Sequence, residues 1–149
     1  MKTRVLMVCL GNICRSPLAE GILKSKVDPA RIEVDSAGTA GYHVGNPPDP
    51  RSVAVAKKYN IDISTQRCRR FSRADFDRFD HILVMDRANY RDVYAMAENE
   101  AQRGKVRLLL ECTNSVPQEV PDPYYGGDDG FETVFRLIDE ACERLIEEL

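Results

Sequence analysis

Near the start of the chain a cysteine and an arginine, Cys9 and Arg15, lie six positions apart with Gly11 between them. An apolar run, Val5 to Val8, precedes them, and helically spaced apolar residues follow over 18–23. A strand, a short loop and a helix in this order form an anion site, because the loop N–H groups and the helix N-terminus converge. The guanidinium of Arg15 can add two parallel hydrogen bonds to phosphate oxygens. A thiolate is favoured at Cys9 on the floor of such a site, so the motif predicts phosphoryl transfer to sulfur.

A purely structural role for Cys9 is the alternative, because buried free cysteines commonly pack as small hydrophobic residues. The spacing between Cys9 and Arg15 is common by chance, but its context favours chemistry. Ser16 supplies a hydroxyl group at the start of the helix, and Pro17 suits the first helical turn, where a missing N–H costs little. We therefore expect a phosphate-binding loop directly after the first strand.

A phosphate ester that is attacked by sulfur expels an oxyanion, which needs a proton. Asp122 lies between Pro121 and Pro123 and is followed by Tyr124 and Tyr125. A carboxyl group held in a stiff loop beside aromatic rings and a phosphate dianion stays protonated longer and can act as a general acid. Asp-Pro is also common turn chemistry, and the residues alone leave these two interpretations open.

Strands and helices that could position these residues alternate along the chain. Segments of strand character cover 4–9, 32–36, 81–85 and 106–110, and helical patterns cover 16–26, 51–59, 72–78 and 87–103. A last helix, whose beginning is marked by Asp129 and Glu132, is predicted by one apolar stripe: Phe131, Val134, Phe135, Ile138, Ala141, Cys142, Leu145 and Leu149. This alternation predicts an α/β fold: one domain over residues 1–149 with a four-stranded, mostly parallel sheet and helices on both faces. In such folds ligands bind at the carboxyl ends of the strands, where the Cys9 loop would lie.

Helix boundaries are marked by capping residues. Ser72 with Asp75 resembles a capping box, Asp86 is a suitable N-cap, and Gly104 is placed to end a helix. Two long segments, 38–50 and 111–130, fit no regular element. Long loops inside a small domain are often functional, so we expect both to fold over the sheet edge near the anion site.

Composition narrows the class of protein. At 149 residues, with 43% hydrophobic and 30% charged residues, the chain suits one globular domain. A net charge of −3 argues against a nucleic-acid partner, and the basic cluster 67–70 is interpreted as a solvated loop. No apolar stretch approaches the ~20 residues of a membrane span. Five cysteines at spacings unlike a disulfide framework indicate a reducing compartment, so we expect a cytoplasmic protein.

The stretch from Val8 to Pro17 resembles the signature of the low-molecular-weight protein tyrosine phosphatases. Three further motifs, 35–39, Met85-Asp86 and 122–125, are similar to motifs of the same family in the same order. The resemblance runs nearly the full length of the chain. It implies the four-stranded α/β fold of that family, a protein tyrosine phosphatase activity, and Asp122 as the general acid.

The resemblance also implies a role for each residue. Cys9 would form a phosphocysteine intermediate, Arg15 and the loop N–H groups would stabilise the phosphate oxygens, and Asp122 would protonate the leaving group and then activate water. No metal or cofactor is implied, since Arg15 and the backbone dipoles supply the positive field. Residues expected to bind phosphate or to support the loop are Leu10, Gly11, Asn12, Ile13, Cys14, Ser16 and Ser36.

A crevice lined by Tyr42, Tyr124 and Tyr125 would admit a phosphotyrosine ring, whereas phosphoserine would be too short to reach Cys9. The implied partners are phosphotyrosine-containing proteins, with an autophosphorylating tyrosine kinase as one candidate, and the chain is expected to be a monomer or to self-associate weakly. Cys14 could trap an oxidised Cys9 as a disulfide, or it could be a small packed residue.

Two departures from the family pattern stand out. Tyr59-Asn60 replaces a common His-Gly pair whose histidine helps brace the phosphate loop, and Arg70 stands where glutamine is common. Neither removes a catalytic group. His43 and His81 have no evident partners, which argues against a catalytic imidazole.

Two other functions compete with the phosphatase. A thioredoxin-coupled arsenate reductase would need a further redox cysteine pair, and Cys68 and Cys112 are too widely spaced for one. A non-catalytic phosphotyrosine-binding module would be expected to lack Cys9, Arg15 or Asp122, and all three are present.

Overall fold

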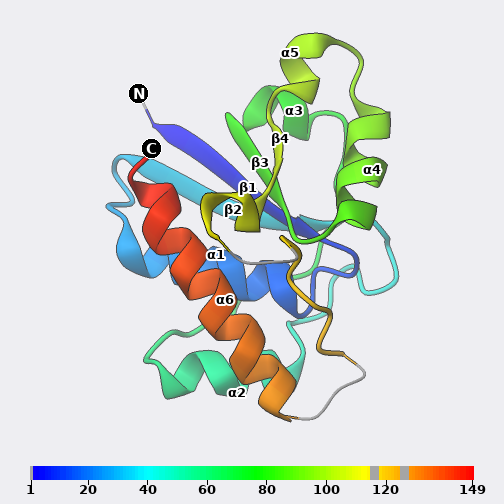
Figure 1. Ribbon diagram of the computed structural model, residues 1–149. Coiled ribbons are helices and arrows are strands. Elements are labelled where there is room, and N and C mark those ends of the chain that lie inside the picture. Colours follow the sequence, from blue (N-terminus) through cyan, green and yellow to red (C-terminus); the bar gives the residue numbers. More distant parts are fainter. Residues whose placement is uncertain (1, 115–117, 125–127) are drawn as a thin grey trace.

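One parallel sheet organises the chain (Figure 1). The computed structural model describes residues 2–114, 118–124 and 128–149. The strand order is β2-β1-β3-β4, and all three neighbouring pairs are parallel. The strands are β1 (Thr3–Cys9), β2 (Ile32–Gly38), β3 (His81–Val84) and β4 (Val106–Leu108). The helices are α1 (Arg15–Lys26), α2 (Pro50–Lys58), α3 (Asp75–Arg78), α4 (Arg87–Met96), α5 (Glu100–Arg103) and α6 (Asp128–Ile146), with the short 3₁₀ helix η1 (Leu109–Cys112).

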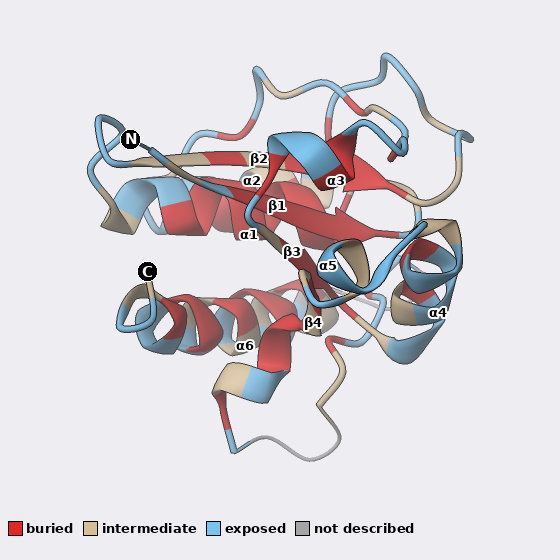
Figure 2. Cartoon of the chain, turned by 90° about the horizontal axis from the view of Figure 1, so that it is seen from above, coloured by how far each residue is buried: buried red, intermediate tan, exposed pale blue. Residues whose placement is uncertain are grey.

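Strand β1 is buried on both faces and divides the core in two. Val5, Met7 and Cys9 face a cluster built with α1, α2 and α6, whereas Leu6 and Val8 face a second cluster built with α3 and α4. This alternation is the two-residue period of a strand covered on both sides, and Figure 2 shows the buried sheet between its helices. The predicted α/β fold with a four-stranded sheet and helices on both faces is confirmed.

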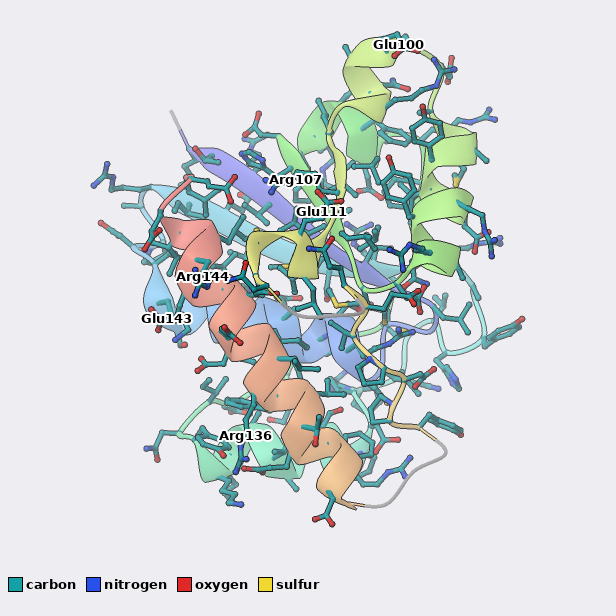
Figure 3. The ribbon with its side chains drawn as sticks, viewed as in Figure 1. Glu100, Arg107, Glu111, Arg136, Glu143 and Arg144 are labelled. Atoms are coloured by element: carbon teal, nitrogen blue, oxygen red, sulfur yellow. The ribbon has the colours of Figure 1, made fainter. Side chains whose placement is uncertain are left out.

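Helix α6 buries the apolar face that its sequence predicted. Seven residues of the predicted apolar stripe are buried: Phe131, Val134, Phe135, Ile138, Ala141, Cys142 and Leu145. The opposite face is charged, and Arg136, Glu143 and Arg144 lie on the outer side of the helix in Figure 3. None of the described helices is long and apolar enough to cross a membrane.

Several predicted boundaries were wrong. The segment expected to be irregular over 111–130 overlaps η1 at one end and the start of α6 at the other. The helix expected over 87–103 is two helices, because Ala97 is extended and the Asn99 side chain accepts the Gln102 N–H to begin α5. The strand expected over 106–110 stops at Leu108, and η1 follows. The helix expected over 72–78 is only α3, because the residues before Asp75 form a turn in which the Asp75 N–H donates to the Ser72 carbonyl.

The carboxyl ends of the strands gather the remaining loops. In Figure 1 the loop after β1, the segment after β2 (cyan) and the segment leading to α6 (gold) lie on the same side of the molecule. Asp86 follows β3 at this end, and the Val120 N–H donates to the Met85 carbonyl 2.8 Å away, which ties the gold segment to the sheet. These segments enclose the anion site expected there.

Candidate active site

The loop between β1 and α1 surrounds the Cys9 sulfur. Cys9 is buried, its Sγ lies 3.0 Å from the Ser16 hydroxyl, and the Asn12 N–H donates to it over 3.3 Å. The sulfur at the end of β1 therefore has a hydroxyl group and a backbone N–H as its neighbours in the loop.

Asn12 determines the shape of the loop. Its φ of 56° lies in the left-handed region, which asparagine tolerates better than most residues. Its Nδ2 donates to the hydroxyl oxygens of Ser16 (2.8 Å) and Ser36 (3.0 Å), and its Oδ1 accepts the Arg69 N–H at 3.0 Å. One buried side chain thus connects the loop to α1, to β2 and to the segment before α3.

Three supporting residues were not foreseen. Buried Glu20 accepts the Ser36 hydroxyl at 2.6 Å and pairs with Lys24, also at 2.6 Å. The Cys68 thiol donates to the Gly11 carbonyl over 2.9 Å, and burial raises the Cys68 pKa to about 11. Glu20 with Lys24 has the spacing of a helical ion pair, which could have indicated its position, but nothing local marks Cys68.

Gly38 has no side chain for a spatial reason. A Cβ at this position would lie 2.8 Å from the Leu10 carbonyl oxygen and 3.1 Å from the backbone nitrogen of Asn12. Only glycine lets β2 approach the phosphate loop this closely.

Arg15 is buried beneath the pocket and held by acceptors. Its Nη1 donates to Asp86 Oδ2 (2.6 Å) and to the Val120 carbonyl (3.1 Å), and its Nη2 lies 3.7 Å from Asp122 Oδ2. Burial alone would lower the Arg15 pKa, but Cys9 and Asp86 more than offset it and raise the pKa above its ordinary value. Both protons of Nη1 are engaged, so Nη2 and Nε remain to bind an anion with a fork of parallel bonds.

Asp86 has two roles, of which the sequence predicted one. Its Oδ1 accepts the Asn89 N–H at 2.8 Å and caps α4, as expected, while its Oδ2 holds Arg15. Methionine and aspartate after a strand gave no indication of this second contact.

Replacing Asp86 with asparagine separates the two roles. Asparagine caps a helix as well as aspartate does, so the variant keeps the start of α4 but leaves the buried Arg15 without its closest carboxylate. We expect the free energy of unfolding to fall by about 2 kcal/mol, less than for a fully buried pair because the Asp86 side chain is partly exposed. Urea denaturation measures this loss, and Asp86→Ala should cost about 1 kcal/mol more through the lost cap. Equal stability of Asp86→Asn and the parent chain would contradict a stabilising pair.

A pocket of about 280 Å³ opens above the sulfur. The residues lining it are Cys9, Leu10, Gly11, Ile13, Cys14, Arg15, Tyr42, His43, Asp122 and Tyr124. Tyr42 is 77% exposed and Tyr124 is 40% exposed, so both rings stand at the mouth. His43, for which no partner was evident, lies against the loop, where a Cβ on Gly11 would be 3.3 Å from its ring.

The Asp122 carboxylate lines the same pocket with 40% of its side chain exposed. It is therefore less enclosed than the aromatic walls predicted. Its Oδ1 accepts the Tyr124 N–H at 3.0 Å, so the residue makes the turn that was the alternative interpretation and faces the pocket as well. Tyr125, also expected in the crevice, lies outside the described residues.

Cys14 is buried at the pocket, where burial, followed by the charges of Asp49 and Cys9, raises its pKa to about 12.

Tyr59 stands where many members of the resembled family carry a histidine that braces the phosphate loop. It stacks on Phe135 of α6 with ring centroids 4.2 Å apart, so its ring does not take the place of that histidine. Bracing comes instead from the Arg69 and Cys68 contacts described above.

The fold and the site together define a class of anion-binding protein. A parallel α/β sheet whose first strand ends in a cysteine, beneath a loop of N–H groups and a fixed guanidinium, belongs to the proteins that bind a tetrahedral anion over a nucleophile. In the described part of the chain, no group of three or more His, Cys, Asp or Glu residues is placed to hold a metal ion.

Comparison with known proteins identifies the family. The family model described as "Low molecular weight phosphotyrosine protein phosphatase" matches residues 4–149. The chain is 40% identical over 148 residues to the Homo sapiens protein of that name, covering 96% of this chain and 93% of the human one. It is 43% identical over 143 residues to the Schizosaccharomyces pombe protein of the same name, covering 91% and 90% of the two chains. The crystal structure of a protein tyrosine phosphatase from Entamoeba histolytica, with Hepes in its active site, aligns with a TM-score of 0.93 at 38% identity, covering 99% of this chain and 96% of that one. The chain belongs to the low-molecular-weight phosphotyrosine protein phosphatase family.

Proposed function

We propose that this protein hydrolyses phosphotyrosine monoesters through a phosphocysteine intermediate on Cys9. The observation that carries the proposal is the pocket itself. It brings the Cys9 sulfur, the Arg15 guanidinium and the Asp122 carboxylate to one cavity, although Asp122 is far from the other two in the sequence. Membership of the family supports the same activity.

In the first step the Cys9 thiolate attacks phosphorus from below, in line with the leaving oxygen. The S–P bond forms as the P–O bond to the aryl group breaks, and protonated Asp122 gives its proton to the departing phenolic oxygen. Nη2 and Nε of Arg15, together with the N–H groups of the loop, stabilise charge on the three equatorial oxygens. The fixed position of Arg15 means that little reorganisation is needed at this stage.

In the second step Asp122, now a carboxylate, takes a proton from water as that water attacks phosphorus. The S–P bond breaks, phosphate leaves, and the thiolate of Cys9 is restored. The Ser16 hydroxyl, 3.0 Å from the sulfur, stabilises the departing thiolate by a hydrogen bond. All atoms and protons are accounted for by the substrate, water, Cys9 and Asp122, so no metal or cofactor enters the proposed steps.

The walls of the pocket favour aryl substrates. Tyr42 and Tyr124 both line the pocket, so an aromatic ring can contact them while its phosphate reaches Cys9. An alkyl phosphate such as phosphoserine is shorter and leaves these contacts unmade. We infer that the substrates are phosphotyrosine-containing proteins, with an autophosphorylating tyrosine kinase as one candidate, and that the protein acts in the cytoplasm as a monomer or with weak self-association.

The direct test is hydrolysis in metal-free buffer containing a chelator. We expect release of phosphate from p-nitrophenyl phosphate and phosphotyrosine peptides, little from phosphoserine peptides, and inhibition by vanadate. Arsenate reduction with thioredoxin is measured in parallel, because a reductase shares the anion site. Arsenate reduction without phosphotyrosine hydrolysis would overturn the proposed function.

Cys14 is proposed as the residue that protects Cys9 from irreversible oxidation. Peroxide converts the Cys9 thiolate to a sulfenic acid, and Cys14 displaces water from it to form a disulfide. After peroxide followed by a thiol reductant, the parent chain should recover most of its activity and Cys14→Ser little. Because attack requires the Cys14 thiolate and burial raises the Cys14 pKa to about 12, the protected fraction should rise as the pH is raised above neutral.

Cys112→Ser is the matched control, because Cys112 lies on η1 beside Arg107 and Glu148, away from the pocket. It should recover as the parent chain does. Full recovery by Cys14→Ser would show that Cys14 is only a packed residue.

A further inference from the structure

Two segments beside the pocket together carry positive charge and no negative charge. The chain carries a net charge of −3, yet segments 36–48 and 63–74 contain no aspartate or glutamate. The second segment contains four arginines: Arg67, Arg69, Arg70 and Arg73. Charge separation of this kind creates a local field that attracts anions even to an acidic protein.

Backbone hydrogen bonds join these two segments into one surface. The Gly38 N–H donates to the Arg69 carbonyl (2.9 Å) and the Phe71 N–H to the Gly38 carbonyl (2.7 Å). Further along, the Gly45 N–H donates to the Cys68 carbonyl at 2.9 Å. Residues 67–71 therefore support the loop that carries Tyr42 and His43 into the pocket.

Arg70 lies beside the pocket mouth on this surface. Its side chain lies along Gly41, where an added Cβ would be 3.5 Å from Cδ and 4.0 Å from Nη1. Tyr42, the next residue, lines the pocket. The Arg70 side chain is exposed, and among the described residues none forms a hydrogen bond or ion pair with it.

Its neighbour Arg69 is different. The Arg69 guanidinium is held by the carboxylates of Asp35 at 3.0 Å and Asp75 at 3.1 Å, so its charge serves the fold. Among the described residues, no carboxylate pairs with the Arg70 guanidinium in this way. The Arg70 side chain stands beside a 77% exposed tyrosine at the rim of a cavity that accommodates one aromatic ring.

We propose that the rim formed by Tyr42 and Arg70 is a subsite for an acidic side chain next to the phosphotyrosine of a peptide substrate. This deepens the proposed function and rests on it. When the phosphorylated ring enters the pocket, the adjoining residues of the peptide must cross the rim. Exposed Tyr42 and Leu10 offer them apolar contact, and the Arg70 guanidinium offers a partner for a carboxylate.

The test compares two phosphotyrosine peptides that differ only at flanking positions, glutamate in one and glutamine in the other. We expect the parent chain to show a higher kcat/KM for the acidic peptide. Arg70→Gln should reduce that preference about threefold to fivefold, the range of one exposed ion pair, mainly through KM. Arg70→Lys should retain most of the preference, and added salt should diminish it.

Arg31→Gln is the matched control. Arg31 precedes β2 at the end of the sheet opposite to Cys9 and is exposed, so its replacement removes the same charge far from the pocket and should leave the preference unchanged. An equal loss on both peptides in Arg70→Gln, or no acidic preference in the parent chain, would overturn the subsite. Failure of the parent chain to hydrolyse either peptide would instead overturn the proposed function.

Discussion

Cys9→Ser will lack phosphatase activity and will still bind phosphate. The hydroxyl group of serine is a far weaker nucleophile than a thiolate. Loss of a covalent nucleophile typically lowers kcat by ~10⁴ or more. Turnover of p-nitrophenyl phosphate measures the loss, and calorimetry with inorganic phosphate or vanadate measures the retained binding.

Retained binding is expected because the anion is held by Arg15 and the loop N–H groups, which the substitution leaves in place. Ser16→Ala is the informative companion variant. It removes the hydroxyl group 3.0 Å from the sulfur but keeps the nucleophile, so its activity should fall by less than that of Cys9→Ser. Turnover of Cys9→Ser at the parent rate would remove the sulfur from the chemistry altogether.

Asp122→Asn will slow hydrolysis of aryl phosphates by ~10²–10³ in kcat, the range expected for loss of a general acid. The loss should grow as the leaving group becomes more basic, because a phenol that leaves poorly as an anion depends most on the proton. A series of substituted phenyl phosphates measures this dependence. Asparagine can still accept the Tyr124 N–H, so the turn itself should survive.

Glu119→Gln is the control for charge in the same segment, since Glu119 pairs with Arg87 outside the pocket. Its kcat should remain close to that of the parent chain. A loss that is the same for all leaving groups in Asp122→Asn would mean that Asp122 positions the substrate and does not transfer the proton.

Much of the fold was predictable from local patterns. The continuous apolar run of β1, whose side chains face two core clusters in alternation, and the helical period of α6 were both visible in the sequence. The boundaries between 87 and 112 were missed for a local reason. A single asparagine cap restarts the helix at Asn99, and the end of β4 depends on where η1 turns.

The candidate site was likewise predictable only in part from the sequence. Cys9, Arg15 and the loop between them are adjacent in the sequence, so their chemistry could be inferred from spacing. The contacts of Arg15 with Asp86 and of Cys68 with Gly11 join residues more than fifty positions apart, and they arise only when parallel strands bring their ends together. His43 was missed because its partner is a glycine, which has no side chain to suggest the contact.

One carboxylate, that of Asp86, both starts α4 and holds the guanidinium beneath the pocket. Fraying of the first turn of α4 would therefore loosen an anion-binding group on a different element. The start of α4 and the binding of phosphate are thus coupled through one side chain, and a substitution that melts this turn is expected to weaken phosphate binding.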